Sequence, residues 1–204
     1  MTESLDADRV DSVASRLGLG LDSGILDRLT RYGDLFLRWN ERINLGGRIS
    51  ADELVERHFL DAFAVARFVG LEDSVVDVGS GGGLPVIPLA LVREKAAFEI
   101  YEPIAKKVAF LRTVVRELGL GSRVKIRPEK VQEALAPALV RRFDVATSRA
   151  TFSPSKWLGM GRNLVRRGGK VIAFGTDEDP GECPTPLEEL RYALNRRLLV
   201  FTAP

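Results

Sequence analysis

Four glycines stand among the five residues 79–83 of the stretch VVDVGSGGGLP (residues 75–85), directly after a short apolar run. Glycine has no Cβ, so such a segment can turn sharply and bring its backbone against another group. Residues 84–92 have helical character, and the first turn of a helix tolerates Pro85 and Pro88. A strand, a glycine loop and a helix in this order are typical of α/β folds that hold a nucleotide-like ligand.

The rest of the chain alternates between the two periodicities. Helices are predicted at residues 22–44, 51–69, 106–118, 131–140 and 155–165, the fourth interrupted or ended near Pro137. Strands are predicted at 75–78, 96–101, 124–127, 143–147 and 170–174, with a turn at Gly168-Gly169. Residues 176–186 are predicted to be a loop, and 191–194 and 197–202 a closing hairpin across Asn195-Arg196.

This order of elements predicts an α/β fold whose parallel sheet has helices on both faces. The first 70 residues contain helical patterns and no strand pattern, so we expect a helical N-terminal extension over residues 1–70 and a ligand-binding domain over 71–204. Ligands of such sheets bind at the carboxyl ends of the strands, and the glycine run lies at the end of the first strand.

Composition narrows the class of protein. No apolar run approaches the roughly 18 residues that a membrane span needs. The acidic start MTESLDADRV lacks the apolar core of a signal peptide, so a cytoplasmic protein is expected. The single cysteine, Cys183, allows neither an internal disulfide nor a cysteine-based metal cluster, and no metal site is expected.

Charge is distributed unevenly along the chain. Residues 104–170 contain 16 Lys or Arg against 4 Asp or Glu, whereas the remaining residues contain 14 against 24. Such asymmetry indicates one face that attracts phosphate groups, although a solvated basic surface would have the same composition.

Two acids near the glycines distinguish between cofactors. Asp77 stands two residues before the first glycine, which disfavours a pyrophosphate and favours a ligand with a cationic amino group. Glu102 ends the next strand about 20 residues on, where an acid accepts hydrogen bonds from ribose hydroxyls. Together they favour S-adenosylmethionine over a dinucleotide; a glycine-rich turn without a ligand is the remaining alternative.

Several segments resemble the glucose-inhibited division protein B family of bacterial 16S rRNA methyltransferases. They are LRWNERINL (37–45), RHFLDAFAV (57–65), VVDVGSGGGLPVIPLA (75–90), EPIAKKVAFLR (102–112), RPEK (127–130), FDVATSRA (143–150) and LVRRGGKVIAF (164–174). They follow the family's order and spacing over residues 30–175. The glycine loop alone is common to class I methyltransferases, but the three segments around Asn40, Gly79 and Arg149 together are specific to the family.

The resemblance implies a class I, Rossmann-like seven-stranded methyltransferase fold with a helical N-terminal extension. It implies methyl transfer from S-adenosylmethionine to N7 of a guanine in 16S rRNA, either free or in the small ribosomal subunit. By position it implies cofactor contacts from Gly79, Leu84, Glu102, Pro128, Glu129 and Arg149, with Pro128 and Glu129 beside the adenine. Asp77, Gly81 and Gly83 of the same loop are further cofactor-binding candidates, and Arg149 is the catalytic candidate.

Four positions depart from the family pattern, namely Gly46, Ala62, Val86 and Phe174. Two alternatives therefore stay open: a methyltransferase for a small molecule or a protein, and a non-catalytic RNA-binding relative. Guanine N7 carries an available lone pair, so its methylation needs alignment and no strong general base. His58, the single histidine, is accordingly expected to be structural. The sequence does not give the oligomeric state, and a monomer is the expectation.

Overall fold

The computed structural model describes residues 4–132, 136–176 and 185–204 of the chain. Within them, seven strands form one sheet in the order β3-β2-β1-β4-β5-β7-β6. The strands are β1 (Ser74–Val78), β2 (Ala97–Tyr101), β3 (Val124–Arg127), β4 (Phe143–Ser148), β5 (Val165–Gly175), β6 (Glu188–Ala193) and β7 (Arg196–Thr202). The first five pair in parallel, and β7 runs antiparallel to both β5 and β6. The predicted seven-stranded α/β fold is confirmed.

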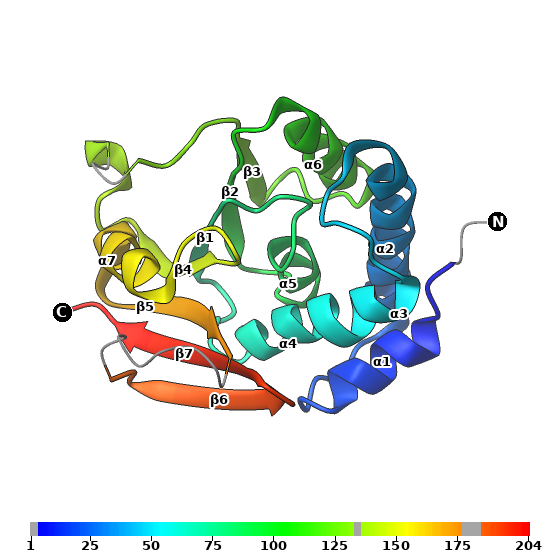
Figure 1. Ribbon diagram of the computed structural model, residues 1–204, viewed down its shortest axis with the longest axis horizontal. Coiled ribbons are helices and arrows are strands. Elements are labelled where there is room, and N and C mark those ends of the chain that lie inside the picture. Colours follow the sequence, from blue (N-terminus) through cyan, green and yellow to red (C-terminus); the bar gives the residue numbers. More distant parts are fainter. Residues whose placement is uncertain (1–3, 133–135, 177–184) are drawn as a thin grey trace.

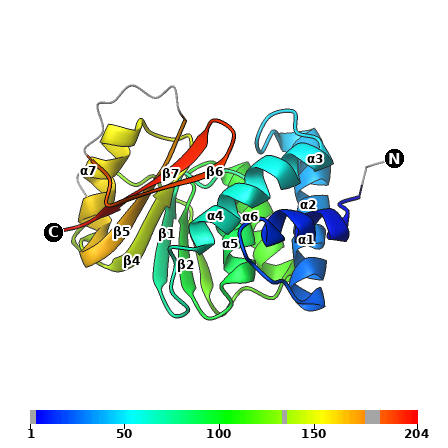
Figure 2. The same ribbon diagram turned by 90° about the horizontal axis from the view of Figure 1, so that it is seen from below.

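Helices cover both faces of this sheet, as Figures 1 and 2 show. On one face, α7 (Pro154–Leu164) packs with the buried side chains of β4, β5 and β7. On the other lie α5 (Val86–Val92), α6 (Ala105–Glu117) and the N-terminal helices. Strand order reverses between β1 and β4, where a ligand is expected at the carboxyl ends of the strands.

The N-terminal helices are α1 (Ala7–Ser15), α2 (Ser23–Ile43), α3 (Ala51–Glu53) and α4 (Leu60–Ala66), with a π-helical turn, η1 (Leu54–Phe59), between the last two. Asp22 caps α2 by accepting a hydrogen bond from the Ile25 N–H at 2.8 Å. Ser50 and Glu53 form a capping box at α3. The helices predicted over 22–44 and 51–69 are thus present, and α1 is an additional helix.

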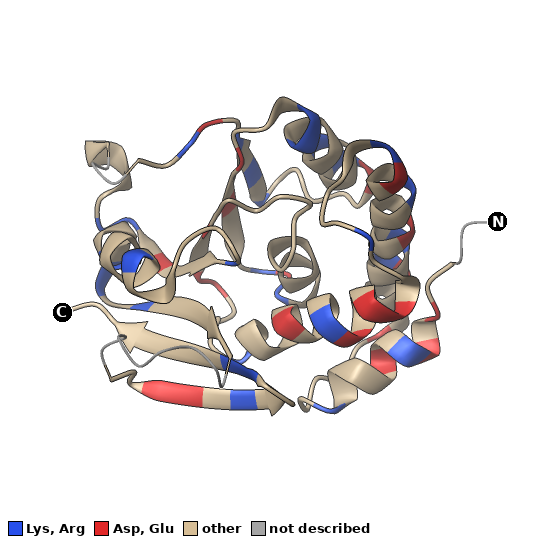
Figure 3. Ribbon diagram, in the orientation of Figure 1, with Lys and Arg blue, Asp and Glu red and all other residues tan. Residues whose placement is uncertain are grey.

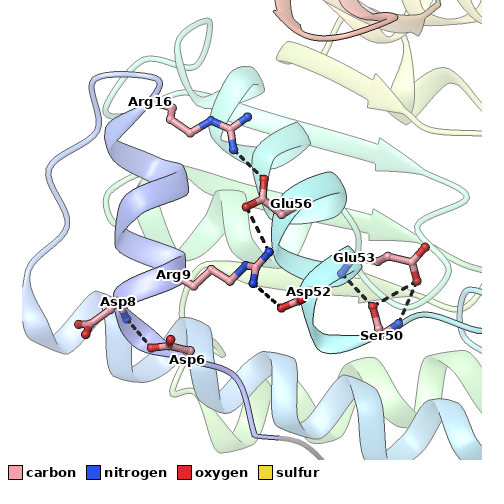
Figure 4. Close-up of polar contacts among 8 residues, drawn as sticks. All are labelled: Asp6, Asp8, Arg9, Arg16, Ser50, Asp52, Glu53 and Glu56. Carbon is pink, nitrogen blue, oxygen red and sulfur yellow. Dashed lines mark hydrogen bonds and ion pairs between the residues drawn. The ribbon is translucent and has the colours of Figure 1, made fainter.

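Apolar packing joins these helices to the sheet. Val10, Phe36 and Phe59 are fully buried in the same hydrophobic cluster as Val75 and Ile100 of the sheet. Ion pairs add a smaller contribution at the outer surface, where Arg9 meets Asp52 at 2.7 Å and Arg16 meets Glu56 at 2.6 Å (Figure 4). These side chains are partly exposed, so the buried apolar contacts dominate the attachment of α1.

Two local predictions are wrong for physical reasons. Within the described part of 131–140, the helical residues are the short 3₁₀ turn η2 (Pro137–Leu139), while residues 133–135 lie outside the described ranges. Pro137 begins this turn, and its ring removes the N–H that a longer helix through it would need.

The expected turn at Gly168-Gly169 lies inside β5 as an irregularity of the strand. The register with β4 shifts there, because Phe143 faces Val165 while Val145 faces Lys170. Gly168, at φ 75°, donates its N–H to the Ala203 carbonyl at 2.9 Å, so pairing with the chain end keeps the segment in the sheet.

The end of the chain follows the prediction more closely. The closing hairpin is confirmed as β6 and β7, with Asn195 in the left-handed region at its turn. Residues 177–184 of the predicted 176–186 loop lie outside the described ranges. Within the described residues, no helix is long and apolar enough to cross a membrane.

The substitution Phe59→Ala tests whether the N-terminal helices share the hydrophobic core of the sheet. The fully buried Phe59 ring stacks on Tyr32 at a centroid distance of 5.9 Å, so Phe59→Ala should lower the unfolding free energy by about 3–5 kcal/mol. The neighbouring Glu56→Gln, which loses partly exposed ion pairs, should cost less than about 1 kcal/mol. Unfolding in urea measures the unfolding free energy of both variants. Equal small effects would mean that the helices pack independently of the sheet.

Candidate functional site

The glycine loop crosses the end of β1 at the switch point of the sheet. The carbonyl of Tyr101, at the end of β2, accepts hydrogen bonds from the N–H groups of Gly79 at 2.8 Å and Ser80 at 3.4 Å. Gly79, Gly81 and Gly83 have φ values of 76°, 59° and 84°, a region that other residues rarely adopt. The loop therefore needs glycine at these positions before any ligand is considered.

The four glycines differ in the space that a side chain would find. Gly82 and Gly83 are buried, and a Cβ would lie 2.5 Å from Phe36 at Gly82 and 2.6 Å from Ile87 at Gly83. Gly79 is half-buried, and a Cβ there would lie 2.3 Å from the Thr151 hydroxyl oxygen. Gly81 is also half-buried, but a Cβ there would meet no atom closer than 3.6 Å, the Leu45 carbonyl oxygen. Side chains of the protein thus explain Gly79, Gly82 and Gly83, while Gly81 presents backbone that a ligand can approach.

Glu102 ties this loop to the start of α6. Its side chain is buried, and its two carboxylate oxygens accept from the Gly81 N–H at 2.8 Å and the Ile104 N–H at 2.9 Å. Each oxygen keeps a second lone pair. The predicted acid thus lies against the predicted loop, where it can accept further hydrogen bonds.

Asp77 lies beneath the loop, inside the sheet. It accepts a hydrogen bond from the Thr147 hydroxyl of β4 at 2.6 Å and is 1% exposed. Burial raises the pKa of Asp77 to about 6, against the lowering effects of Ser80, Thr147 and the charge of Arg149. Asp77 thus joins β1 to β4 and puts negative potential below the loop.

A cleft of about 410 Å³ opens beside Gly79. Its lining residues are Val78, Gly79, Tyr101, Pro103, Glu129, Lys130, Val131, Thr151, Phe152, Ser153 and Lys156. Of the predicted residues it brings Gly79 and Glu129 together, with Pro128 exposed next to Glu129. Tyr101, Thr151 and Phe152 were missed by sequence reasoning, although they stand at or just after the ends of β2 and β4, where such sheets place their sites.

Leu84 and Arg149 lie outside the lining of this cleft. Leu84 is half-buried against the hydrophobic core just before α5. Arg149, after β4, extends toward the N-terminal helices, where its Nη1 lies 3.3 Å from the Asp61 carboxylate of α4. The structure thus separates Arg149 from the Glu129 side of the site.

The loop after α2 packs on the glycine loop. The Asn40 side chain accepts from the N–H groups of Leu45 and Gly46 and donates to the Gly47 carbonyl at 2.6 Å. Leu45 and Phe36 then contact Gly82, whose carbonyl accepts a hydrogen bond from the Tyr32 hydroxyl at 2.8 Å. A hollow of about 740 Å³ adjoins this loop between Leu37 and Glu53, and mostly exposed residues line it.

A protein-family model described as GidB, rRNA small subunit methyltransferase G, matches residues 25–188. The chain belongs to this family. The resemblance found in the sequence is thereby confirmed.

Curated relatives support the assignment over most of the chain. A ribosomal RNA small subunit methyltransferase G of Anaeromyxobacter dehalogenans (strain 2CP-C) is 37% identical over 159 residues, which cover 78% of this chain and 73% of the relative. One from Stenotrophomonas maltophilia (strain K279a) is 35% identical over 199 residues, covering 91% of each.

Solved structures with little sequence identity share the fold. An RNA methyltransferase of Salinibacter ruber in complex with S-adenosyl-L-homocysteine has a TM-score of 0.55 at 20% identity, covering 72% of this chain and 90% of its own. The pyocyanin biosynthetic protein PhzM has a TM-score of 0.60 at 15% identity, covering 83% of this chain and 62% of its own. The Rossmann-like fold expected from the resemblance is confirmed.

The family's TSRA segment supports the end of β1. Thr147 bonds to Asp77, and the Ser148 hydroxyl donates to the Val78 carbonyl at 2.8 Å. Of the positions that depart from the family pattern, Ala62 and Val86 are fully buried, Phe174 packs against the core, and Gly46 is exposed beside Ile49.

Asp77 makes stability depend on pH. Its pKa is higher in the folded protein, about 6, than the ordinary value of 3.8, so the folded state binds more protons between these values and loses stability as pH rises. Asp77→Asn removes this dependence. The difference in unfolding free energy between wild type and the variant should therefore change by about 2 kcal/mol between about pH 4 and pH 7, in favour of the variant at higher pH. Parallel pH curves in urea unfolding would contradict this.

Proposed function

We propose that this protein transfers a methyl group from S-adenosylmethionine to N7 of a guanine in 16S rRNA, free or within the small ribosomal subunit. Family membership supports the reaction and the substrate. The observation that carries the cofactor site is the contact between the open glycine backbone at Gly81 and the buried carboxylate of Glu102. We further propose that residues 1–70 form an extension of a methyltransferase domain over 71–204, and that the protein works as a cytoplasmic monomer.

The residues present fit this cofactor. Glu102 has lone pairs available for ribose hydroxyls, the backbone of Gly81 lets a ligand approach closely, and Gly79 lines the cleft. Glu129 lines the cleft beside Gly79, where an adenine would lie, and Pro128 precedes it in the chain. Asp77 provides negative potential for an amino group, Gly83 sets the backbone turn, and Leu84 continues the wall of the loop.

When bound, the cofactor supplies a methyl group on a positively charged sulfur. Guanine N7 already carries a lone pair, so the protein has no proton to remove before the attack. The contribution of its residues is alignment, which can lower a barrier by about 7–11 kcal/mol. His58 suits this scheme because burial first, and then Arg149, Arg196 and Arg57, lower its pKa to about 3, which leaves it uncharged at neutral pH.

Arg149 is the proposed catalytic residue. Its guanidinium lies beside α4, with Nη1 3.3 Å from the Asp61 carboxylate, and its charge lowers the pKa of Asp77 against the larger, opposite effect of burial. A planar cation in this place can orient an anionic group of the cofactor or of the substrate nucleotide.

The proposed RNA surface includes the basic residues that follow β2. Lys106, Arg112 and Arg116 on α6 and Lys125 on β3 are exposed. Figure 3 shows basic segments on α6 and β3, while acidic segments recur on α1, α3 and β6. Such a surface attracts RNA phosphates.

Glu102→Gln tests the cofactor site. In a glutamine, an NH2 group replaces one of the two oxygens that now accept from Gly81 and Ile104, so a donor would face one of these N–H groups and fewer lone pairs remain for a ribose. We expect affinity for S-adenosylhomocysteine, measured by calorimetry, to fall at least about tenfold. The control Glu94→Gln, which loses an exposed pair with Arg28, should bind like wild type. Equal affinity of both variants would remove Glu102 from the site.

Labelled S-adenosylmethionine tests the substrate. Wild type should label N7 of a guanine in 16S rRNA or in assembled small subunits, mapped by mass spectrometry. Replacing Arg112 and Arg116 together by Gln should weaken RNA binding and reduce its salt slope by about 2, because two phosphate contacts are lost. Arg67→Gln, exposed beyond α4, is the control.

The other outcomes separate the alternatives. Binding of a substrate that is indifferent to salt would favour a small-molecule or protein methyltransferase. RNA binding without affinity for S-adenosylhomocysteine would favour a non-catalytic relative.

A further inference from the structure

A buried carboxylate joins the N-terminal helices to two distant parts of the sheet. Asp61 of α4 is fully buried. Its Oδ1 accepts a hydrogen bond from the Tyr192 hydroxyl of β6 at 2.6 Å, and its Oδ2 accepts one from Arg196 Nη2 of β7 at 2.9 Å. Arg149 Nη1 lies 3.3 Å from the same Oδ2.

The three partners of Asp61 differ in how firmly they hold its carboxylate. Tyr192 and Arg196 belong to the closing hairpin, and Arg196 is fixed further because its Nη1 donates to the Arg57 carbonyl at 2.8 Å. The contact with Arg149 is an ion pair without hydrogen-bond geometry, and Arg149 Nη1 is buried with no hydrogen-bond partner among the described residues. The hairpin therefore fixes the carboxylate, and the carboxylate attracts Arg149 while leaving its donors available.

Arg149 needs the attraction of Asp61 to stay in place, because a second cation lies beside the same carboxylate. Arg149 and Arg196 are two cations beside one carboxylate, and His58 nearby is kept neutral by burial and by the surrounding arginines. Without the carboxylate the two guanidiniums would face each other at a site shielded from water, and Arg149, which stands outside any strand or helix, would move away.

Arg149 is also close to the glycine loop, because the Thr151 hydroxyl lies 3.2 Å from the Arg149 carbonyl oxygen and 3.3 Å from the Gly79 carbonyl oxygen. Burial raises the pKa of both Asp77 and Tyr32, and in each case the charge of Arg149 acts in the opposite direction. Asp77 lies under the loop, and Tyr32 donates its hydroxyl hydrogen to the Gly82 carbonyl. A shift of Arg149 would therefore change the charge beside the loop itself.

We propose that Asp61 is a positioning residue, which holds the Arg149 guanidinium beside the glycine loop through the anchor that Tyr192 and Arg196 give its carboxylate. The inference rests on the proposed function, in which Arg149 orients the cofactor or the substrate. The closing hairpin then supports the site, because it anchors the carboxylate that positions Arg149.

A double-mutant cycle tests the proposal. Asp61→Asn should lower kcat/KM for methyl transfer to the small subunit by roughly 10- to 100-fold, the effect of a misplaced orienting group. Arg149→Gln should lower it at least as much, and adding Asp61→Asn to Arg149→Gln should cause little further loss, because Asp61 acts through Arg149. Wild-type activity of Asp61→Asn, or effects that multiply in the double variant, would overturn the proposal.

Two further variants serve as controls that separate a loss of structure from a loss of positioning. Thermal unfolding identifies loss of structure in Asp61→Asn; if it occurs, Asp61→Asn with Arg196→Gln removes the carboxylate together with one cation, which keeps the net charge of the cluster. Recovery of both stability and activity in that protein would reduce Asp61 to a structural role, whereas recovered stability with activity still lost supports positioning. Glu189→Gln, which neutralises another carboxylate of the hairpin paired with Arg197, should stay active.

Nuclear magnetic resonance separates this inference from the proposed function. The Arg149 Nε–H signal, identified by its loss in Arg149→Lys, should exchange with water faster in Asp61→Asn than in wild type or Glu189→Gln. Unchanged exchange would overturn the positioning role whether or not the wild-type protein methylates RNA. If wild type labels no RNA while Asp61→Asn still accelerates the exchange, the proposed function fails and the contact between Asp61 and Arg149 stands.

Discussion

The site depends on one short interaction, the hydrogen bond from the Gly81 N–H to the Glu102 carboxylate. It connects the loop after β1 with the residue after β2, and the second oxygen of the carboxylate fixes the start of α6 through Ile104. A buried carboxylate is costly unless hydrogen bonds satisfy it, so loop and acid each require the other in place. A ribose that bonds to this carboxylate would meet an acceptor whose orientation is already set.

The N-terminal helices also support the glycine loop. Phe36 and Leu45 contact Gly82, and Tyr32 bonds to its carbonyl, so the floor of the loop is made by residues that precede the first strand. Asn40 holds the loop that carries Leu45. The N-terminal segment is therefore part of the structure that shapes the glycine loop.

Sequence patterns predicted the elements whose signal is local. The run 75–78, the glycines and the helix after Pro85 were recognisable because periodicity and glycine content reflect backbone preferences directly. At 131–140 the apolar periodicity overstated a segment in which Pro137 begins a short 3₁₀ turn. Gly168 was mispredicted because a pairing partner far away in sequence, Ala203, decides its conformation. Asp61 gave no local signal for the same reason, since its partners lie just after β4 and on β6 and β7, and only the fold brings them together.

The glycine run itself shows how a motif can combine two requirements. Its inner members, Gly82 and Gly83, are needed because Phe36 and Ile87 occupy the space of a side chain, which would hold in a protein without any ligand. Gly81 has no such neighbour within 3.6 Å, yet its backbone is left-handed and its N–H is committed to Glu102. Packing thus accounts for the inner glycines, and the open space in front of Gly81 is the part of the motif that a cofactor explains.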